Sequence, residues 1–216
     1  MKSRFLALLV MLTLSAPVFA GAYEDMEEAM TRGDVNAVIA LINRGMEVNT
    51  VDRQGNTLLI QSIWRDLPEL FDYLMQRKAR INMRNRNGET ALSIAAYLGR
   101  AQYVQRLVEA GAEVNFFGWS PLAYAAYNGH AEIVDYLIKR GAEIDAKTEN
   151  GSTALFFASR FGHLETVRAL LARRADPSIV NDNGETALDW ALKGNNTDVV
   201  NLLRAAGKRL GKPVAK

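Results

Sequence analysis

Clusters of apolar residues at helical spacing recur along the chain from residue 35 onward. Within each cluster the apolar residues lie one, three or four positions apart, which places them on one face of an α-helix. The clusters are Val38, Leu41 and Ile42; Leu70, Phe71 and Leu74; Tyr103, Val104, Leu107 and Val108; Ile133, Val134, Leu137 and Ile138; Val167, Leu170 and Leu171; and Val199, Val200, Leu202 and Leu203. We therefore expect six amphipathic helices with their apolar faces buried in a common core.

A shorter helix is predicted before these amphipathic helices. The clearest case is Ser120-Pro121-Leu122-Ala123-Tyr124-Ala125-Ala126, because serine is a favoured N-cap and proline is favoured at the first helical position. Each short helix is followed by a residue that suits a left-handed backbone, usually glycine and otherwise asparagine or aspartate. These break positions are Gly33, Asp66, Gly99, Gly129, Gly162 and Asn195.

One phrase returns before the last five short helices. Its copies are Gly55-Asn56-Thr57-Leu58-Leu59, Gly88-Glu89-Thr90-Ala91-Leu92, Gly118-Trp119-Ser120-Pro121-Leu122, Gly151-Ser152-Thr153-Ala154-Leu155 and Gly184-Glu185-Thr186-Ala187-Leu188. The glycines are 33, 30, 33 and 33 residues apart. A period of this length indicates stacked units, each too small to bury its own hydrophobic face. The sequence thus predicts an all-α solenoid, for which binding is the default function.

Together with loops such as Gly111-Ala112-Glu113-Val114-Asn115, these motifs resemble those of ankyrin-repeat proteins, in which Gly-x-Thr-Pro-Leu-His, Ala-Ala-x-x-Gly-His and Gly-Ala-x-Val-Asn recur. The resemblance covers about residues 23–207. It implies a stack of about six helix-turn-helix units with projecting β-turn fingers, which bind partners through the fingertips and the concave face of the inner helices. The approximate repeats are 23–54, 55–87, 88–117, 118–150, 151–183 and 184–207, followed by a basic tail at 208–216.

The sequence departs from the family pattern in two ways. The histidine that usually follows Thr-Pro-Leu is replaced in every repeat, so its turn-bracing hydrogen bond must be made otherwise or lost. The replacements are Ile60, Ser93, Ala123, Phe156 and Asp189. The 30-residue step also shortens one finger by three residues and leaves the aromatic sequence Asn115-Phe116-Phe117-Gly118-Trp119.

Residues 1–22 are typical of a secretory signal peptide, with a positive flank at Lys2 and Arg4, an apolar run from Phe5 to Leu14 and small residues after it. Cleavage after Ala20 and cleavage after Ala22 both fit, and an uncleaved anchor is the alternative. The apolar run is shorter than the ~20 residues of a membrane span, so we expect no stable insertion after cleavage. We expect a periplasmic protein of a bacterium.

The net charge and the cysteine content of the chain argue against some classes of partner and of chemistry. The chain holds 26 Lys and Arg against 24 Asp and Glu, so removal of Lys2 and Arg4 leaves the mature protein close to neutral. A neutral domain has no global field that attracts nucleic acid or an anionic membrane. The chain has no cysteine, which excludes thiol catalysis and thiolate metal sites, and which favours a bacterial over a eukaryotic exported protein.

The sequence contains few residues that are candidates for catalysis or for metal binding. The two histidines, His130 and His163, follow the break glycine in adjacent repeats, and this repetition favours a packing role over a metal site. The segment from Asn181 to Glu185 resembles a calcium loop, but Ile179 and Trp190 occupy the first and last ligand positions. We expect no enzyme activity, no cofactor and no metal.

Recognition has better candidates. Just past the Ala-Ala pair of the inner helices, at positions that the resemblance places on the concave face, stand Trp64, Tyr97, Tyr127, Arg160 and Lys193. Trp, Tyr and Arg are the residues most often found as binding hot spots. With Phe116 and Trp119 of the short finger they predict an aromatic strip that binds a protein. The alternative is that these rings only stack on one another or cover the core.

A basic stretch from Arg77 to Arg86, which contains Arg84, offers a second surface. Such a surface would meet an acidic partner and speed association, unless it is only the solvated edge of a finger. We therefore expect a monomeric, non-catalytic module that binds a protein of the bacterial envelope as a scaffold or helper. An immunity-type inhibitor of a toxin remains an alternative, as does a ligand-binding protein or enzyme with a hidden site.

Overall fold

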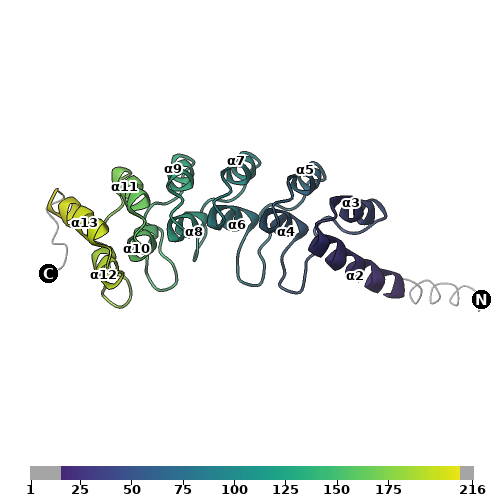
Figure 1. Cartoon of the computed structure of the whole chain (residues 1–216), viewed down its shortest axis with the longest axis horizontal. Coiled ribbons are helices and arrows are strands. Elements are labelled where there is room, and N and C mark those ends of the chain that lie inside the picture. The colour runs from purple at the N-terminus through teal and green to yellow at the C-terminus, as the bar shows by residue number, and fades with distance from the viewer. Residues whose placement is uncertain (1–15, 210–216) are drawn as a thin grey trace, which may run out of the picture. The chain divides into compact units, whose positions relative to one another are not determined.

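The computed structural model describes residues 16–209 and the side chains of residues 21–208. Over these residues the regular structure is helical, apart from two isolated β-bridges that join Val51 to Thr57 and Val180 to Thr186 (Figure 1). Both bridges lie at the bases of finger loops. The predicted all-α fold of repeated helix pairs is confirmed.

The chain divides into two compact units, residues 1–80 and 81–216. The described part of the first unit holds α2 (Ala16–Arg32), α3 (Val35–Asn43), α4 (Leu58–Trp64) and α5 (Pro68–Gln76). In this unit α2 packs against α3, α4 against α5, and α3 against α5. The buried residues Val38, Phe71 and Leu74 form part of its core.

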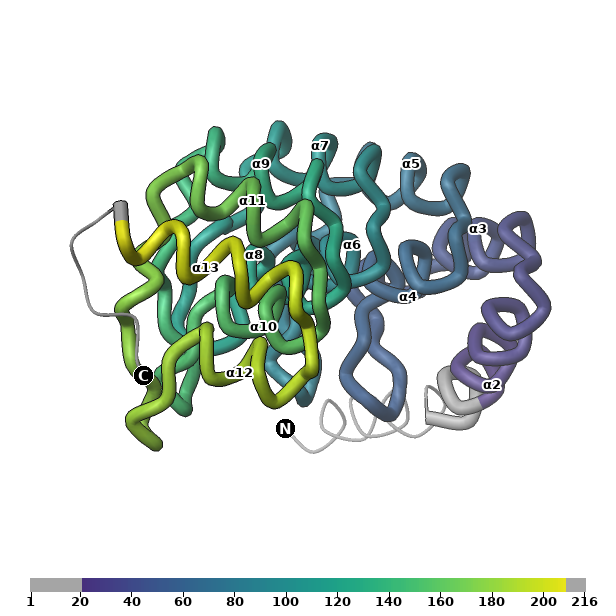
Figure 2. The backbone as a smooth tube through the Cα atoms, turned by 60° about the vertical axis from the view of Figure 1, so that its left-hand side comes forward, coloured from purple at the N-terminus to yellow at the C-terminus, as the bar shows by residue number. Residues whose placement is uncertain are grey.

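The second unit repeats one helix pair four times. Its helices are α6 (Ala91–Tyr97), α7 (Ala101–Glu109), α8 (Pro121–Tyr127), α9 (Ala131–Lys139), α10 (Ala154–Arg160), α11 (Leu164–Ala172), α12 (Ala187–Lys193) and α13 (Thr197–Arg209). The inner helices α6, α8, α10 and α12 pack in one row, and the outer helices α7, α9, α11 and α13 pack in another. In the turned view of Figure 2 the outer helices α7, α9 and α11 lie above the inner helices α6, α8, α10 and α12.

Short inner helices are stabilised by caps and by complete burial of one face. Thr57, Thr90, Ser120 and Thr186 each accept a hydrogen bond from the backbone N–H three residues on, which satisfies one of the free donors of the first turn. The leucine at the start of each inner helix is buried, as are the small residues behind it; examples are Leu92, Ala95, Leu122 and Ala125. Packing against neighbouring units therefore supplies what a seven-residue helix lacks by itself.

All six predicted break positions adopt the left-handed backbone. Four of them are glycines, and the other two, Asp66 and Asn195, both have φ of 55°. The same conformation occurs at a second column after the outer helices, where Lys78 and Arg174 stand with φ of 57° and 70°. Asp and Asn tolerate this region better than Lys and Arg do.

The projecting fingers are β-turns closed by a backbone hydrogen bond to the glycine of the repeated phrase. Gly55 N–H donates to Asp52 O at 2.9 Å, Gly88 N–H to Asn85 O at 3.0 Å, and Gly184 N–H to Asn181 O at 2.9 Å. The loop between α7 and α8 is visibly shorter than the loop between α9 and α10 in Figure 1. The shorter finger predicted from the 30-residue step is therefore present in the structure.

The missing histidines have different consequences in different repeats. In the last repeat Asp189 takes over, because its Oδ2 accepts bonds of 2.7 Å from both the N–H and the hydroxyl of Thr186. In the third repeat the hydroxyls of Ser93 and Thr90 lie 3.1 Å apart. Phe156 cannot form such a bond, and the Oγ1 of Thr153 is buried without a hydrogen-bond partner.

Most of the predicted signal peptide, residues 1–15, lies outside the described residues, and Ala16 to Ala22 form the first turns of α2. In the predicted basic tail, Lys208 and Arg209 belong to α13, and residues 210–216 lie outside the described residues. Among the residues that were described, no helix combines the length and the apolar character that crossing a membrane requires.

Candidate functional site

Five aromatic side chains of the second unit contact one another and are called the aromatic cluster: Tyr97, Trp119, Tyr124, Tyr127 and Phe157. The ring centres of Trp119 and Phe157 are 4.4 Å apart, and those of Trp119 and Tyr124 are 5.2 Å apart. Tyr97 meets Tyr124 edge-on at 6.0 Å and lies 6.4 Å from Tyr127. Tilted and edge-on pairs at such distances are favourable arrangements of aromatic rings.

The repeat places these rings together. Tyr124 and Tyr127 are three residues apart on α8 and so share one helix face. Tyr97 has the same position on α6 as Tyr127 on α8, and Phe157 has the same position on α10 as Tyr124 on α8. Trp119 reaches the cluster from the finger base, directly before the residue that caps α8. Inner-helix face and finger base thus meet at one surface.

Packing and exposure coexist in the cluster. Phe157 is buried, whereas Tyr97, Trp119, Tyr124 and Tyr127 are half-buried. The rings do stack on one another, as the alternative interpretation predicted, and four of them still reach the surface. The cluster extends to Phe161, which is 4.6 Å from Tyr127 and 47% exposed, and to Trp190, which is 5.8 Å from Phe157.

A carboxylate adjoins the cluster at Glu89. The hydroxyl of Tyr124 donates to its Oε1 at 3.2 Å, and the amide of Asn85 donates to its Oε2 at 2.7 Å. Burial, followed by the charges of Glu89 and Glu149, raises the pKa of Tyr124 well above its usual value. Tyr124 therefore remains a neutral hydrogen-bond donor at any physiological pH.

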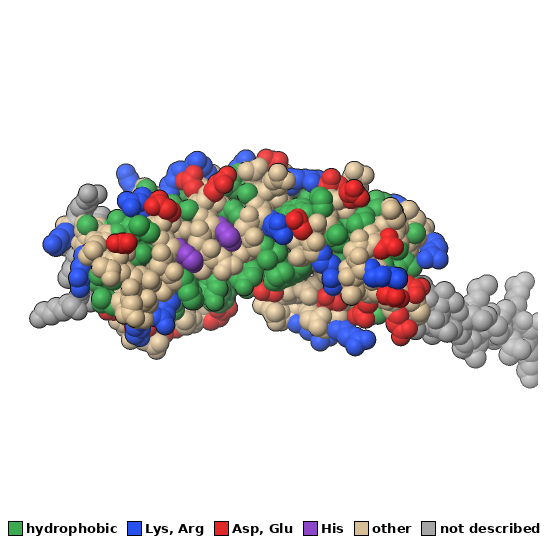
Figure 3. Space-filling model, viewed as in Figure 1, with side chains coloured by type: hydrophobic (Ala, Val, Ile, Leu, Met, Phe, Trp, Pro, Cys, Tyr) green, Lys and Arg blue, Asp and Glu red, His purple; other side chains and the backbone are tan. Residues whose placement is uncertain are grey.

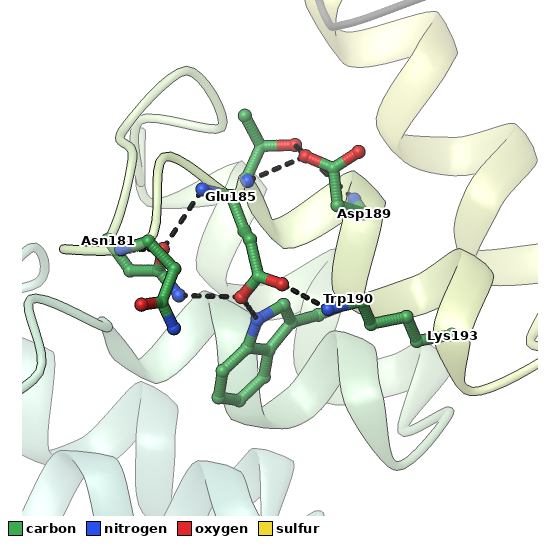
Figure 4. A network of polar contacts seen from close by, with 7 residues as sticks. Asn181, Glu185, Asp189, Trp190 and Lys193 are labelled. Carbon is green, nitrogen blue, oxygen red and sulfur yellow. Dashed lines mark hydrogen bonds and ion pairs between the residues drawn. The ribbon is translucent and has the colours of Figure 1, made fainter.

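A second carboxylate, Glu185, holds the far end of the aromatic surface (Figure 4). Its Oε2 accepts bonds from the indole N–H of Trp190 at 2.7 Å and from the amide of Asn181 at 2.9 Å. Its Oε1 accepts a bond from the ammonium of Lys193. These bonds, that from Lys193 first, lower the pKa of Glu185 to about 2. The network fixes the Trp190 ring beside Phe157.

The short finger shows one exposed ring and one covered ring. The guanidinium of Arg84 lies over Phe116, with its central carbon 4.2 Å from the ring centre. Phe117 is 81% exposed. Gly118 has φ of +95°, a backbone conformation that strains residues with a β-carbon, and Glu149 Oε1 lies close to it. In Figure 3 hydrophobic side chains border a notch in the lower edge of the molecule, where Figure 1 draws this loop.

The other predicted binding residues are placed as follows. Trp64 ends α4 in the first unit and is 43% exposed, whereas the aromatic cluster lies in the second unit. Arg160 ends α10 and is half-buried, and its backbone carbonyl accepts a bond from Asn196. Arg86 is exposed on its finger.

The basic stretch is only partly a free charged surface. Arg77 donates to the hydroxyl of Tyr73 at 3.0 Å and to the side chain of Asn43, and Arg84 covers Phe116. These two guanidinium groups are held by neighbours within the fold. Their partners are neutral, so both groups keep their positive charge, and binding of an acidic partner by the basic stretch stays a prediction.

Both histidines are half-buried and make contacts between repeats. His130 Nε2 lies 3.0 Å from Tyr97 O and His163 Nε2 lies 2.9 Å from Tyr127 O, so each ring can donate a hydrogen bond to a backbone carbonyl. Each imidazole also lies against the break glycine of the preceding repeat. Among the described residues, His, Asp and Glu side chains form no group of three or more that could hold a metal ion.

The sequence interpretation missed Tyr124, Phe157, Phe161 and Phe117. Tyr124 and Phe157 could have been found, because they stand three positions before the last residues of α8 and α10 and so share the same helix face. Which of the two phenylalanines of the short finger faces outward depends on the position of Arg84, a finger away, and no spacing rule predicts it.

Comparison with known proteins gives a family and two partial relatives. A family model described as ankyrin repeats, in three copies, matches residues 65–148 and 141–212. An ankyrin repeat domain-containing protein, SAT10, of Stachybotrys chartarum is 32% identical over 95 residues, which are 44% of this chain and 5% of that protein. Alpha-latrotoxin-Lg1a of Latrodectus geometricus is 28% identical over 93 residues, 42% of this chain and 7% of the toxin. The chain thus matches only a small part of either relative.

Proposed function

The chain belongs to the ankyrin-repeat family, and from this premise we propose that it is an exported module of the bacterial envelope that binds a partner protein through the aromatic cluster. Ankyrin repeats bind other proteins, and the family is in general non-catalytic. The proposed role is that of a scaffold or helper for a second envelope protein.

One observation carries the binding site: four half-exposed aromatic side chains, Tyr97, Trp119, Tyr124 and Tyr127, gather on one surface. Tyr and Trp are typical of binding hot spots because they bring a large apolar area and a polar group together. Mutual ring contacts restrict their rotamers before binding, so less conformational entropy is lost when a partner covers them.

Export is supported by the sequence of residues 1–22, and the absence of cysteine favours a bacterial over a eukaryotic exported protein. Two measurements test it. Fractionation of the producing bacterium should recover the protein in the periplasm, and N-terminal sequencing of that protein should begin at Gly21 or at Tyr23. Recovery in the cytoplasm with the leader intact would refute export. It would leave the proposal that the aromatic cluster binds a partner unaffected.

Capture tests the binding function. The mature protein is immobilised, exposed to periplasmic extract, and the retained proteins are identified by mass spectrometry. We expect one stoichiometric partner, and we expect the Tyr97→Ala/Tyr127→Ala variant to lose it. Tyr136→Ala is the matched control, because it removes the same side chain from the outer helix α9 of the repeat that holds Tyr127.

Helical content by circular dichroism should be the same in all three proteins. Retention of the partner by the double variant would remove the aromatic cluster from the proposal. A protein that retains nothing from the extract but binds a toxin delivered from outside would instead be an immunity-type inhibitor.

A further inference from the structure

Glu89 and Glu185 occupy the same position in two repeats but have different partners. Each directly precedes the threonine that caps a seven-residue inner helix, α6 after Glu89 and α12 after Glu185. Each also accepts a bond from the asparagine four residues earlier, Asn85 or Asn181. The two carboxylates therefore stand at equivalent places, and their surroundings can be compared directly.

At Glu185 the chain supplies the cation itself. The ammonium of Lys193, the last residue of α12, bonds to Glu185 Oε1 (Figure 4). The side chain of Lys193 thereby reaches back along its helix to the finger that precedes it. The carboxylate of this repeat is therefore neutralised within the fold.

Among the described side chains of residues 21–208, none that carries a positive charge bonds to Glu89. The last residue of α6, equivalent to the lysine of α12, is Tyr97, a member of the aromatic cluster. The donors that Glu89 receives from side chains are neutral: the hydroxyl of Tyr124 and the amides of Asn85 and Asn87. The place that a cation fills in the last repeat is thus bordered by aromatic rings here.

A second carboxylate approaches the same rings from the next finger. Glu149 Oε1 lies against Gly118, the residue before Trp119. The charges of Glu89 and Glu149 both act on Tyr124, whose ring is 5.2 Å from that of Trp119. The half-exposed rings of Trp119 and Tyr124 therefore lie within the field of two carboxylates.

A partner that covers Trp119 and Tyr124 comes close to these carboxylates and displaces part of their water. Removing water from an ionised carboxylate without a compensating charge is strongly unfavourable, so a purely apolar partner surface would bind poorly. A cation on the partner offsets this unfavourable free energy through two contacts. It forms an ion pair with a carboxylate, and it is attracted to the faces of the Trp and Tyr rings. Arginine suits both contacts, since its planar guanidinium stacks on rings and forms two parallel bonds to a carboxylate.

We propose that the aromatic cluster and Glu89 together bind an arginine side chain of the partner protein, which takes the place beside Glu89 that Lys193 takes beside Glu185. This inference rests on the proposed protein-binding function and names the chemistry that the partner presents. Arg84 does not fill this role within the chain, because its guanidinium is stacked on Phe116.

The experiment uses two short capped peptides, Gly-Arg-Gly and the same peptide with neutral citrulline in place of arginine. Each is titrated into the mature protein while the indole N–H resonance of Trp119 is followed by NMR, with the backbone amide resonances of the outer helix α9 as internal references. We expect the arginine peptide to shift the Trp119 resonance with an affinity at least about tenfold higher than the citrulline peptide, a difference of ~1.4 kcal/mol. Glu89→Gln should remove most of this preference, and Glu132→Gln on the outer helix α9 should leave it unchanged.

Tyr97→Lys is a second variant that tests the proposal if Glu89→Gln fails to fold. Lysine at this position has a native precedent in Lys193, so the variant should fold, pair its ammonium with Glu89 and abolish binding of the arginine peptide. Equal affinity for the two peptides, no shift with either, or an arginine preference that survives both Glu89→Gln and Tyr97→Lys would overturn the proposal. Partner capture through Tyr97 and Tyr127 would then still stand, so failure of this inference is distinguishable from failure of the proposed function.

Discussion

The guanidinium of Arg84 lies 4.2 Å from the centre of the Phe116 ring, and this contact ties the short finger to the finger before it. Asn115 fixes the other side of the loop, because its Nδ2 donates to Gly141 O and its Oδ1 accepts from Glu143 N–H, both at 2.8 Å. Between these contacts Phe117 is left 81% exposed. The two adjacent phenylalanines therefore have opposite roles, one in packing and one at the surface.

Substitutions in the short finger should separate these roles. Arg84→Ala should lower the free energy of unfolding by about 0.5–1 kcal/mol, the usual value of a cation–π contact near the surface. Phe117→Ala should change it by less than about 0.5 kcal/mol, since the ring is exposed. Urea unfolding followed by circular dichroism measures both. A larger loss for Phe117→Ala than for Arg84→Ala would contradict the assignment of the two rings.

The fold was predictable because a helix, cap or break that is unclear in one repeat can be recognised from the same position in the other repeats. Each helix, cap and break recurs at the same position in several units, so even Asp66 and Asn195 could be recognised as left-handed positions from the glycines in their column. Coupling between units was less predictable. The hydroxyl of Tyr124 reaches Glu89 in the repeat before it, and Arg84 reaches a ring one finger away, and neither contact follows from the pattern within a single repeat.

The candidate site also contains residues that the repeat pattern predicts and residues whose contacts it does not predict. Tyr97, Trp119 and Tyr127 were identified from their column and from the aromatic short finger, and they do meet in one cluster. Arg77 and Arg84 were identified from charge alone, which says nothing about whether a side chain is already engaged. A long cationic side chain can bind an aromatic ring or an amide several residues away, so its availability to a partner is decided by tertiary structure.

Two threonines at equivalent N-caps provide a matched test of the missing histidines. Thr186 Oγ1 is bonded to Asp189, whereas Thr153 Oγ1 is buried without a hydrogen-bond partner. Thr186→Val should therefore cost about 0.5–2 kcal/mol, the usual value of a lost N-cap. Thr153→Val should be neutral or stabilising, because it replaces an unsatisfied buried hydroxyl with a methyl group. Urea unfolding of the two variants decides, and equal losses would show that the two caps are alike.

Arg174 offers a route to higher stability. It is exposed and has φ of 70°, a conformation that costs a residue with a β-carbon roughly 1–2 kcal/mol. Arg174→Gly removes this strain and loses up to ~1 kcal/mol through the greater freedom of the unfolded chain, so a small net gain is expected. The control is Gly141→Ala at the equivalent position, where φ is 91° and no atom lies within 4 Å of a built β-carbon. It should lower the melting temperature through backbone strain alone, and a rise in that temperature would refute the argument.

The carboxyl group of Glu185 should make part of the stability depend on acid. Hydrogen bonds from Lys193, Asn181 and Trp190 lower its pKa from 4.5 to about 2, so the folded state favours the ionised form. Their stabilising contribution is therefore fully present above pH 4.5 and is lost as the pH falls from there towards 2. An NMR titration of the Glu185 side chain should give a midpoint well below 4.5, and Lys193→Met should move that midpoint upward because it removes the largest cause. A midpoint near 4.5 in the unmodified protein would mean that the network of Figure 4 does not hold the carboxylate in solution.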